Sequence, residues 1–164
     1  MSTKEKAEAL RKAYKAKGWN SRMITVRVRS VTYSMAIDVT IRSAAVNYAE
    51  AKAMLLELES RRWCEASGEE LLGGNTYVGI EYAKEVLEPV CAKYKELIAP
   101  LEPGEWKEID GVEVSREKDE PNTYHLVAMH ADGMSGTNLY GRGCWGAAGA
   151  AEGLALFKLK GQTA

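Results

Sequence analysis

The feature that most constrains the fold is a pair of segments in which apolar and polar residues alternate strictly. In ITVRVRS, residues 24–30, and AIDVTIRS, residues 36–43, isoleucine or valine occupies every second position. Successive side chains of a strand point to opposite faces of a sheet, so each segment predicts a strand buried on one face only. Because the segments follow one another closely, we expect a hairpin. Its polar face would carry Thr25, Arg27, Arg29, Asp38, Thr40 and Arg42.

Helical spacing of apolar residues surrounds these strands. Ser2 and Glu5 fit a capping box, which predicts the start of a helix over residues 3–17. The same spacing predicts a second helix over residues 46–62 and a third that ends near Ala99, with a strand over residues 76–82 before it. Residues 66–75 are rich in turn-forming residues and predict a loop.

The segment after Pro100 and Pro103 changes to short strands. EWKEI and VEVSR flank Asp110-Gly111, a dipeptide typical of a tight hairpin turn, and TYHLVAMH predicts a further strand. LALFKLK, near the end of the chain, is interpreted as an edge strand. We therefore expect an α+β fold, with a mixed or antiparallel sheet, about three helices packed on one face, and a β-rich C-terminal part.

The length of 164 residues suits a single compact domain over residues 1–164. Within it we expect a helix–strand–strand–helix–strand–helix unit over about 1–100 and a β-rich, glycine-rich extension over about 104–164. No apolar run approaches the roughly 20 residues that cross a bilayer, so no membrane association is expected. The three cysteines are widely spaced and lack metal-ligand spacing, so we expect reduced thiols, no metal and no cofactor.

A net charge of −1 conceals a separation of charge along the chain. Residues 1–62 contain thirteen Lys and Arg against six Asp and Glu, whereas residues 63–164 contain nine against seventeen. Such asymmetry is typical of proteins with a charged interaction face, although the two halves could also neutralise each other in the fold.

Two candidate surfaces follow from this separation. Basic and aromatic residues near the hairpin could hold phosphate by charge and stack a base on an indole, unless Trp19 is buried beneath the first helix. A second, acidic surface could mimic phosphate. The binding candidates are Trp19, Asn20, Arg22, Arg27, Arg29, Arg42, Asn75 and Tyr77; the acidic candidates are Glu105, Glu108, Asp110, Glu113, Glu117, Asp119 and Glu120.

Residues of about 4–82 resemble a known domain family. The helix ending in GWNSR, the paired strands and GGN before Tyr77 are similar to large polyvalent protein-associated domain 29 of phages and conjugative elements. The resemblance implies a protein of a mobile genetic element that acts in the cytoplasm of a bacterial host cell against host defences such as restriction or CRISPR systems. It supplies no catalytic residue. Asn20 and Asn75 are family-like positions for which turn formation is as good an explanation as binding.

These observations favour a non-enzymatic binding protein for counter-defence, whose partner is a host defence protein or ribonucleoprotein complex. A nucleic-acid-binding accessory protein that uses the basic sheet face is one alternative. Another is an enzyme with a dispersed site near His130 and Asp132, which would share one face of a strand. The sequence contains no motif that identifies a catalytic residue, and it does not indicate the oligomeric state.

Overall fold

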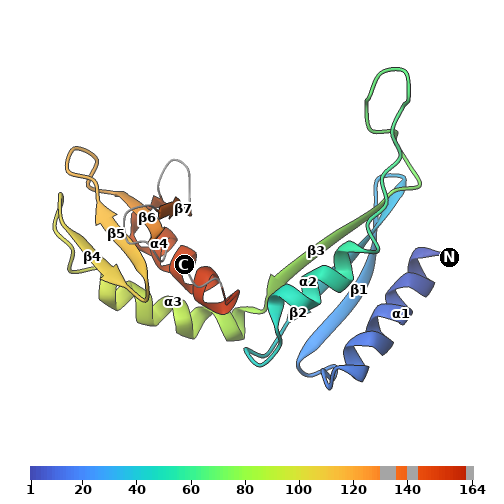
Figure 1. Ribbon diagram of the computed structural model, residues 1–164, viewed down its shortest axis with the longest axis horizontal. Helices are drawn as coiled ribbons and strands as arrows, with labels where there is room; N and C mark the ends of the chain where they lie inside the picture. The colour runs from blue at the N-terminus through green and yellow to red at the C-terminus, as the bar shows by residue number, and fades with distance from the viewer. Residues whose placement is uncertain (130–135, 140–143, 162–164) are drawn as a thin grey trace. The chain divides into compact units, whose positions relative to one another are not determined.

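The computed structural model describes residues 1–129, 136–139 and 144–161, and it confirms the α+β class (Figure 1). The chain divides into two compact units, Met1–Val86 and Leu87–Ala164. The sequence analysis placed the internal division near residue 100, after the third helix, whereas most of that helix belongs to the second unit. A single domain over residues 1–164 stays a prediction.

The first unit contains a sheet with the strand order β1-β2-β3. The predicted hairpin is confirmed: β1 (Ile24–Val31) pairs antiparallel with β2 (Ser34–Ile41). The strand β3 (Thr76–Tyr82) pairs parallel with β2, which makes the sheet mixed. A parallel neighbour requires a crossover connection, and α2 (Tyr48–Leu56) supplies its helix.

Two helices pack on the apolar face of this sheet. The helix α1 (Thr3–Ala16) begins with the predicted capping box, in which the Ser2 hydroxyl accepts from the Glu5 N–H and Glu5 accepts from the Ser2 N–H. Figure 1 shows α1 and α2 running along the strands. The Tyr14 hydroxyl joins the helices by donating to the Ala51 carbonyl at 2.8 Å. Beneath them Ile37, Val39 and Ile41 are fully buried.

The segment between α2 and β3 contains the predicted loop over residues 66–75, but the predicted helix before it is shorter. The helix over 46–62 ends earlier, at Leu56, because the chain beyond it pairs with the start of β3: Ser60 and Thr76 exchange both backbone hydrogen bonds, at 3.0 and 2.8 Å. An isolated bridge joins Trp63 and Glu70 farther out. Residues 60–76 therefore form a two-stranded arm that projects from the sheet (Figure 1).

The second unit is built around a sheet with the order β4-β5-β6-β7, and β8 also pairs with β6. Asp110 and Gly111 both have positive φ, 51° and 79°, as the predicted tight turn requires. The helix α3 contains Pro89, whose missing N–H leaves the Glu85 carbonyl without its intrahelical donor. The remaining element bounds are α3 (Lys84–Ile98), β4 (Trp106–Ile109), β5 (Val112–Arg116), β6 (Thr123–Met129), β7 (Gly136–Asn138) and β8 (Cys144–Trp145).

The interpretation of LALFKLK as an edge strand is wrong. All but the last of these residues belong to the helix α4 (Gly146–Leu159). Leu154, Ala155 and Phe157 are buried together with Ala150 and Ala151, a spacing of three to four residues that follows one side of a helix. Most of the other positions are alanine, glycine or leucine, with only Glu152 and Lys158 charged, so the helical period is not visible as a continuous polar face. The helix packs with α3 on the inner face of the second sheet.

Candidate functional site

The polar face of the first sheet is assembled as the alternation predicts. Thr25 lies opposite Thr40, Arg27 opposite Asp38, and Arg29 opposite Ala36. Residues paired across neighbouring strands point to the same face. The face therefore lies opposite the two helices, and it also includes Tyr77, Gly79 and Glu81 of β3, which pair with Ala36, Asp38 and Thr40.

This face is less basic than the sequence suggests. The Arg29 guanidinium forms an ion pair with Asp38, and Arg42 lies 3.5 Å from a Glu85 carboxylate oxygen. Arg27 is exposed and forms no ion pair with a described residue, but Glu81 stands on the same face. A shallow depression of about 630 Å³ over the strands includes both Asp38 and Glu81 in its lining. Carboxylates interleaved with the arginines oppose the close approach of a phosphate backbone.

Trp19 and its neighbours form a turn rather than a stacking surface at the edge of the basic face. Trp19 is only 8% exposed, and its ring packs on that of Tyr14 at a centroid distance of 5.6 Å. The Asn20 side-chain oxygen accepts from the Arg22 N–H at 2.9 Å, and the Asn20 carbonyl accepts from Met23 and Ile24. The structure thus agrees with the alternative in which Trp19 is buried beside the first helix.

Asn75 and Tyr77 connect the arm to the sheet. Asn75 is 2% exposed; its side-chain oxygen accepts from the Arg62 N–H, and its amide donates to the Leu71 carbonyl at 2.9 Å. The same amide approaches Glu70 and the Tyr77 hydroxyl, and that hydroxyl donates to Glu70 at 2.7 Å. Every polar atom of the Asn75 side chain is used within the protein. Its contacts are those of a structural residue.

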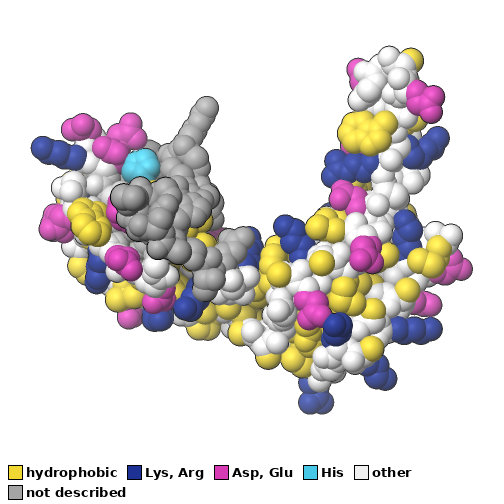
Figure 2. Space-filling view, in the orientation of Figure 1, with side chains coloured by type: hydrophobic (Ala, Val, Ile, Leu, Met, Phe, Trp, Pro, Cys, Tyr) yellow, Lys and Arg dark blue, Asp and Glu magenta, His cyan; other side chains and the backbone are white. Residues whose placement is uncertain are grey.

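The outer face of the second sheet carries three of the seven acidic candidates, and Figure 2 shows Asp and Glu side chains beside a histidine on this unit. Glu108 lies directly opposite Glu113, and Trp106 lies opposite Ser115. Their neighbours in sequence, Ile109, Val112 and Val114, point inward and are buried. Glu117 reaches the same face, where its carboxylate accepts from Nε2 of His125 at 3.0 Å. We call Trp106, Glu108, Glu113, Glu117 and His125 the acidic face.

The acidic face carries no Lys or Arg among the described positions of β4, β5 and β6 that point outward. Glu108 and Glu113 have no ion-pair partner in the described part of the chain. Like charges directly opposite on a sheet destabilise it by roughly 0.2–1 kcal/mol. Trp106 beside them is 65% exposed, unusual for so large an apolar side chain.

The other acidic candidates have local roles. Asp110 accepts from the Tyr94 hydroxyl at 2.6 Å, and this hydrogen bond lowers the pKa of the Asp110 carboxyl. Glu105 accepts from the N–H of Glu102, and Glu120 accepts from the hydroxyl of Thr123. Asp119 is exposed in the turn before β6.

Sequence reasoning missed two members of the acidic face. Trp106 and His125 were not among the candidates, yet both occupy outward positions in their strands. The alternation of EWKEI contained a usable signal, because Trp106 and Glu108 are two residues apart and must share a face. The contact of His125 with Glu117 depends on the pairing of β5 with β6, which sequence spacing alone does not specify.

His130 and Asp132, proposed for a dispersed enzyme site, lie outside the described residues. Within the residues that are described, no three His, Cys, Asp or Glu side chains gather as a metal-ion site. None of the described helices is both long enough and apolar enough to cross a membrane.

Comparisons of this chain with family models, curated proteins and solved structures gave no match. The resemblance of residues 4–82 to the phage and conjugative-element domain family therefore stays a prediction.

Proposed function

We propose that this chain is a non-enzymatic binding protein of a phage or mobile genetic element that counters a host defence. It does so by occupying the basic, nucleic-acid-binding surface of a host defence protein or ribonucleoprotein complex. The observation that carries this proposal is the acidic face: Glu108 lies directly opposite Glu113, Glu117 follows on the same face, and no Lys or Arg occupies the described outward positions of β4, β5 and β6.

Charge complementarity supports such a partner. Carboxylates present their oxygens to Arg and Lys as phosphates do, in short charge-assisted hydrogen bonds. The repulsion between Glu108 and Glu113 is relieved when a cationic side chain enters between them, so the free protein is poised for a basic partner. Trp106 offers a large exposed ring for an arginine to stack upon, and Trp and Arg are prominent among residues that dominate interface energies.

The first sheet gives less support to direct nucleic-acid binding. Two of its three candidate arginines, Arg29 and Arg42, have carboxylate partners. Trp19, which would have stacked a base at its edge, packs on Tyr14 instead. Placing the protein in a mobile element and in a bacterial cytoplasm rests on the resemblance of residues 4–82 and belongs to the proposal.

A capture experiment tests the proposal. The tagged full chain is incubated with bacterial lysate, with and without nuclease, and bound material is identified by mass spectrometry. We expect the tagged chain to capture a nucleic-acid-binding defence protein both with and without nuclease. Added duplex DNA should displace this protein from the tagged chain. The combined variant Glu108→Gln, Glu113→Gln and Glu117→Gln should not capture it.

Two matched variants control for charge and folding. Glu88→Gln, Glu96→Gln and Glu152→Gln together make the same charge change at exposed helical positions and should retain the partner. Arg27→Gln, Arg29→Gln and Arg42→Gln together test the basic sheet. Capture that disappears with nuclease, or that depends on the arginines and not on the acidic face, overturns the proposal.

A further inference from the structure

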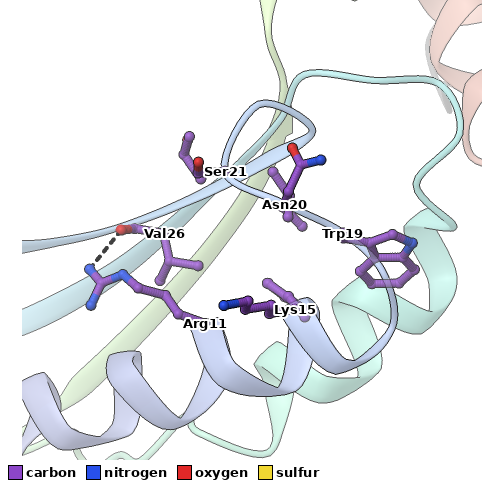
Figure 3. Close-up of a pocket in the computed structure, with 9 residues that line it drawn as sticks. Arg11, Lys15, Trp19, Asn20, Ser21 and Val26 are labelled. Carbon is purple, nitrogen blue, oxygen red and sulfur yellow. Dashed lines mark hydrogen bonds between the residues drawn. The ribbon is translucent and has the colours of Figure 1, made fainter.

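The edge strand β1 of the first unit is partly occupied by a side chain of the same chain. Nη2 of Arg11, on α1, donates to the Val26 carbonyl at 2.8 Å, and Figure 3 shows the guanidinium reaching across to the strand. Farther along β1, Arg27 and Arg29 are exposed. Charged side chains at the edge of a sheet discourage pairing with another chain, so β1 is a protected edge.

The edge strand β4 of the second unit presents free backbone groups. Within the described part of the chain it pairs with β5 alone, at one end of the sheet. The Glu105 carbonyl accepts from the Arg116 N–H of β5 at 2.9 Å, so Lys107, two residues on, also bonds to β5. Trp106 and Glu108 alternate with them, and their N–H and C=O groups point away from β5. No hydrogen bond from elsewhere among the described residues reaches these groups.

The side chains of β4 differ between the two sides of the sheet. Trp106 and Glu108 belong to the acidic face, and Glu113 of β5 lies directly opposite Glu108. Lys107 points to the inner side, because it pairs with the buried Val114. A further strand beside β4 would meet carboxylates and an exposed indole ring on the outer side and a lysine on the inner side. Basic side chains of such a strand therefore fit the outer side only.

A shallow groove of about 540 Å³ borders this edge on the inner side. It lies between the end of α3 and the start of β4, where Leu97, Pro100 and Leu101 give it an apolar part. The two charged side chains that line it, Glu105 and Lys107, have opposite signs. Uncharged side chains at every second position of a docked strand fit this groove.

We infer that β4 is a docking edge for an extended segment of a basic protein, which joins the sheet as an additional antiparallel strand. Arginine or lysine side chains of that segment lie beside Trp106 and Glu108, and the alternate, uncharged side chains lie over the groove. In strand addition, backbone hydrogen bonds supply affinity and alternate side chains supply specificity. The described pairs of this sheet are all antiparallel, which favours that direction. The inference rests on the proposed function, since it states how a basic partner meets the acidic face.

NMR titration of the nitrogen-15-labelled full chain with a peptide in which arginine alternates with valine, TRVRVRT, tests the inference. We expect this peptide to bind at least about tenfold more tightly than TEVEVET, which the acidic face repels. The amide hydrogens of Trp106 and Glu108 should exchange with solvent at least about tenfold more slowly in the complex, because each donates to the peptide. Unaltered exchange at both amides, or no binding up to about 1 mM, overturns the inference. Self-association of the full chain that the peptide reverses would assign the edge to a second copy and also overturn it.

Two N-methylated peptides separate strand pairing from charge attraction. In the antiparallel arrangement the arginines lie directly opposite Trp106 and Glu108, so the arginine N–H groups face β4 and the valine N–H groups face away. Methylation of the arginine nitrogens should weaken binding at least about tenfold, whereas methylation of the valine nitrogens should alter it little. Equal binding of the two peptides overturns the inference. The proposed function would still stand in that case, because it fails only if the acidic face captures no partner.

Substitutions in the protein locate the edge. Trp106→Ala removes the indole ring, and Trp106→Pro removes in addition the outward N–H without loss of a hydrogen bond to β5. We expect TRVRVRT to bind about tenfold more weakly to Trp106→Ala and at least about fivefold more weakly again to Trp106→Pro. Glu108→Gln should weaken binding about fivefold, whereas Glu88→Gln, the same charge change at an exposed position of α3, should leave it unaltered. Backbone NMR spectra check the fold of each variant, and equal binding to Trp106→Ala and Trp106→Pro overturns the inference.

Discussion

At the scale of single residues, buried polar contacts distinguish structural side chains from those available for binding. Asn75 and Asn20 both lie in turns and both fitted the family resemblance. Asn75 is buried and meets four groups of the arm and of β3, whereas Asn20 is exposed and accepts through its side chain only from the Arg22 N–H. The energetic roles of the two residues must therefore differ.

Replacing Asn75 by Ala should lower the free energy of unfolding by roughly 3 kcal/mol, because the Arg62 N–H and the Leu71 carbonyl lose a buried partner. Asn20→Ala, the matched control, should cost no more than about 1 kcal/mol. Urea denaturation followed by circular dichroism measures both. Equal losses in the two variants would contradict a structural role specific to Asn75.

The Tyr94–Asp110 hydrogen bond makes a pH-dependent contribution. Burial raises the pKa of Tyr94, and its neutral hydroxyl stabilises the Asp110 carboxylate and lowers that carboxyl's pKa from 3.8. Because the pKa of this carboxyl is lower in the folded state, the folded state is stabilised at pH values above the ordinary pKa of the carboxyl. This stabilisation is lost as the pH falls through the lowered pKa. Lys93, 4.0 Å away, acts in the same direction.

In Tyr94→Phe, the pKa of Asp110 should rise toward 3.8, as followed by carbon-13 NMR of the carboxyl group. Stability at neutral pH should fall by roughly 1 kcal/mol, since the carboxyl is partly exposed, and the difference should narrow as the pH falls from 3.8 through the lowered pKa of Asp110. Tyr77→Phe is the control: it also removes a tyrosine hydroxyl, but one distant in sequence, and it should leave the pKa of Asp110 unaltered. An Asp110 pKa that does not move in Tyr94→Phe would show that the hydrogen bond does not cause the shift.

At the scale of elements, the arm depends on glycine where it meets the first hairpin. Gly73 has φ +84°, and a β-carbon there would lie 3.2 Å from the Tyr33 carbonyl oxygen. Tyr33, in the turn between β1 and β2, itself has a positive φ of 59° and accepts from the Gly74 N–H at 3.0 Å. Two turns are thus locked together by a close backbone contact.

Gly73→Ala should destabilise the protein by about 2 kcal/mol, the sum of a left-handed backbone and a close contact. Gly68→Ala is the matched control: it also has positive φ, +69°, but nothing lies within 4 Å of its added carbon, so only the conformational cost of roughly 1 kcal/mol is expected. Thermal unfolding compares the two. A Gly68 variant as unstable as the Gly73 variant would mean that the contact with Tyr33 costs nothing.

The elements that sequence reasoning predicted are those with a clear period. The alternation around Arg27 and Asp38 gave β1, β2 and their shared face, and Asp110-Gly111 gave the turn between β4 and β5. The helix α4 was missed because alanine and glycine hide its period, and the arm was missed because Ser60 pairs with a residue sixteen positions away. Such pairing depends on tertiary contacts.

At the scale of the whole molecule, the charge separation of the sequence is distributed over two units with different surfaces. In the first unit, carboxylates of Asp38 and Glu85 offset the arginines, so the excess of positive charge along the chain does not produce a purely basic face. In the second unit, β-pairing concentrates carboxylates on one side. The sequence identified the acidic segment, but strand register decides which of its members act together.

The most direct measurement of the central claim is the plating efficiency of a phage on bacteria that restrict it through a nucleic-acid-binding defence, with and without this protein. The account predicts that the protein restores plating. The combined variant Glu108→Gln, Glu113→Gln and Glu117→Gln should not restore it, whereas the control variant Glu88→Gln, Glu96→Gln and Glu152→Gln should. Restored plating that survives loss of the acidic face, or no restoration against any restriction or CRISPR system tested, would contradict the account.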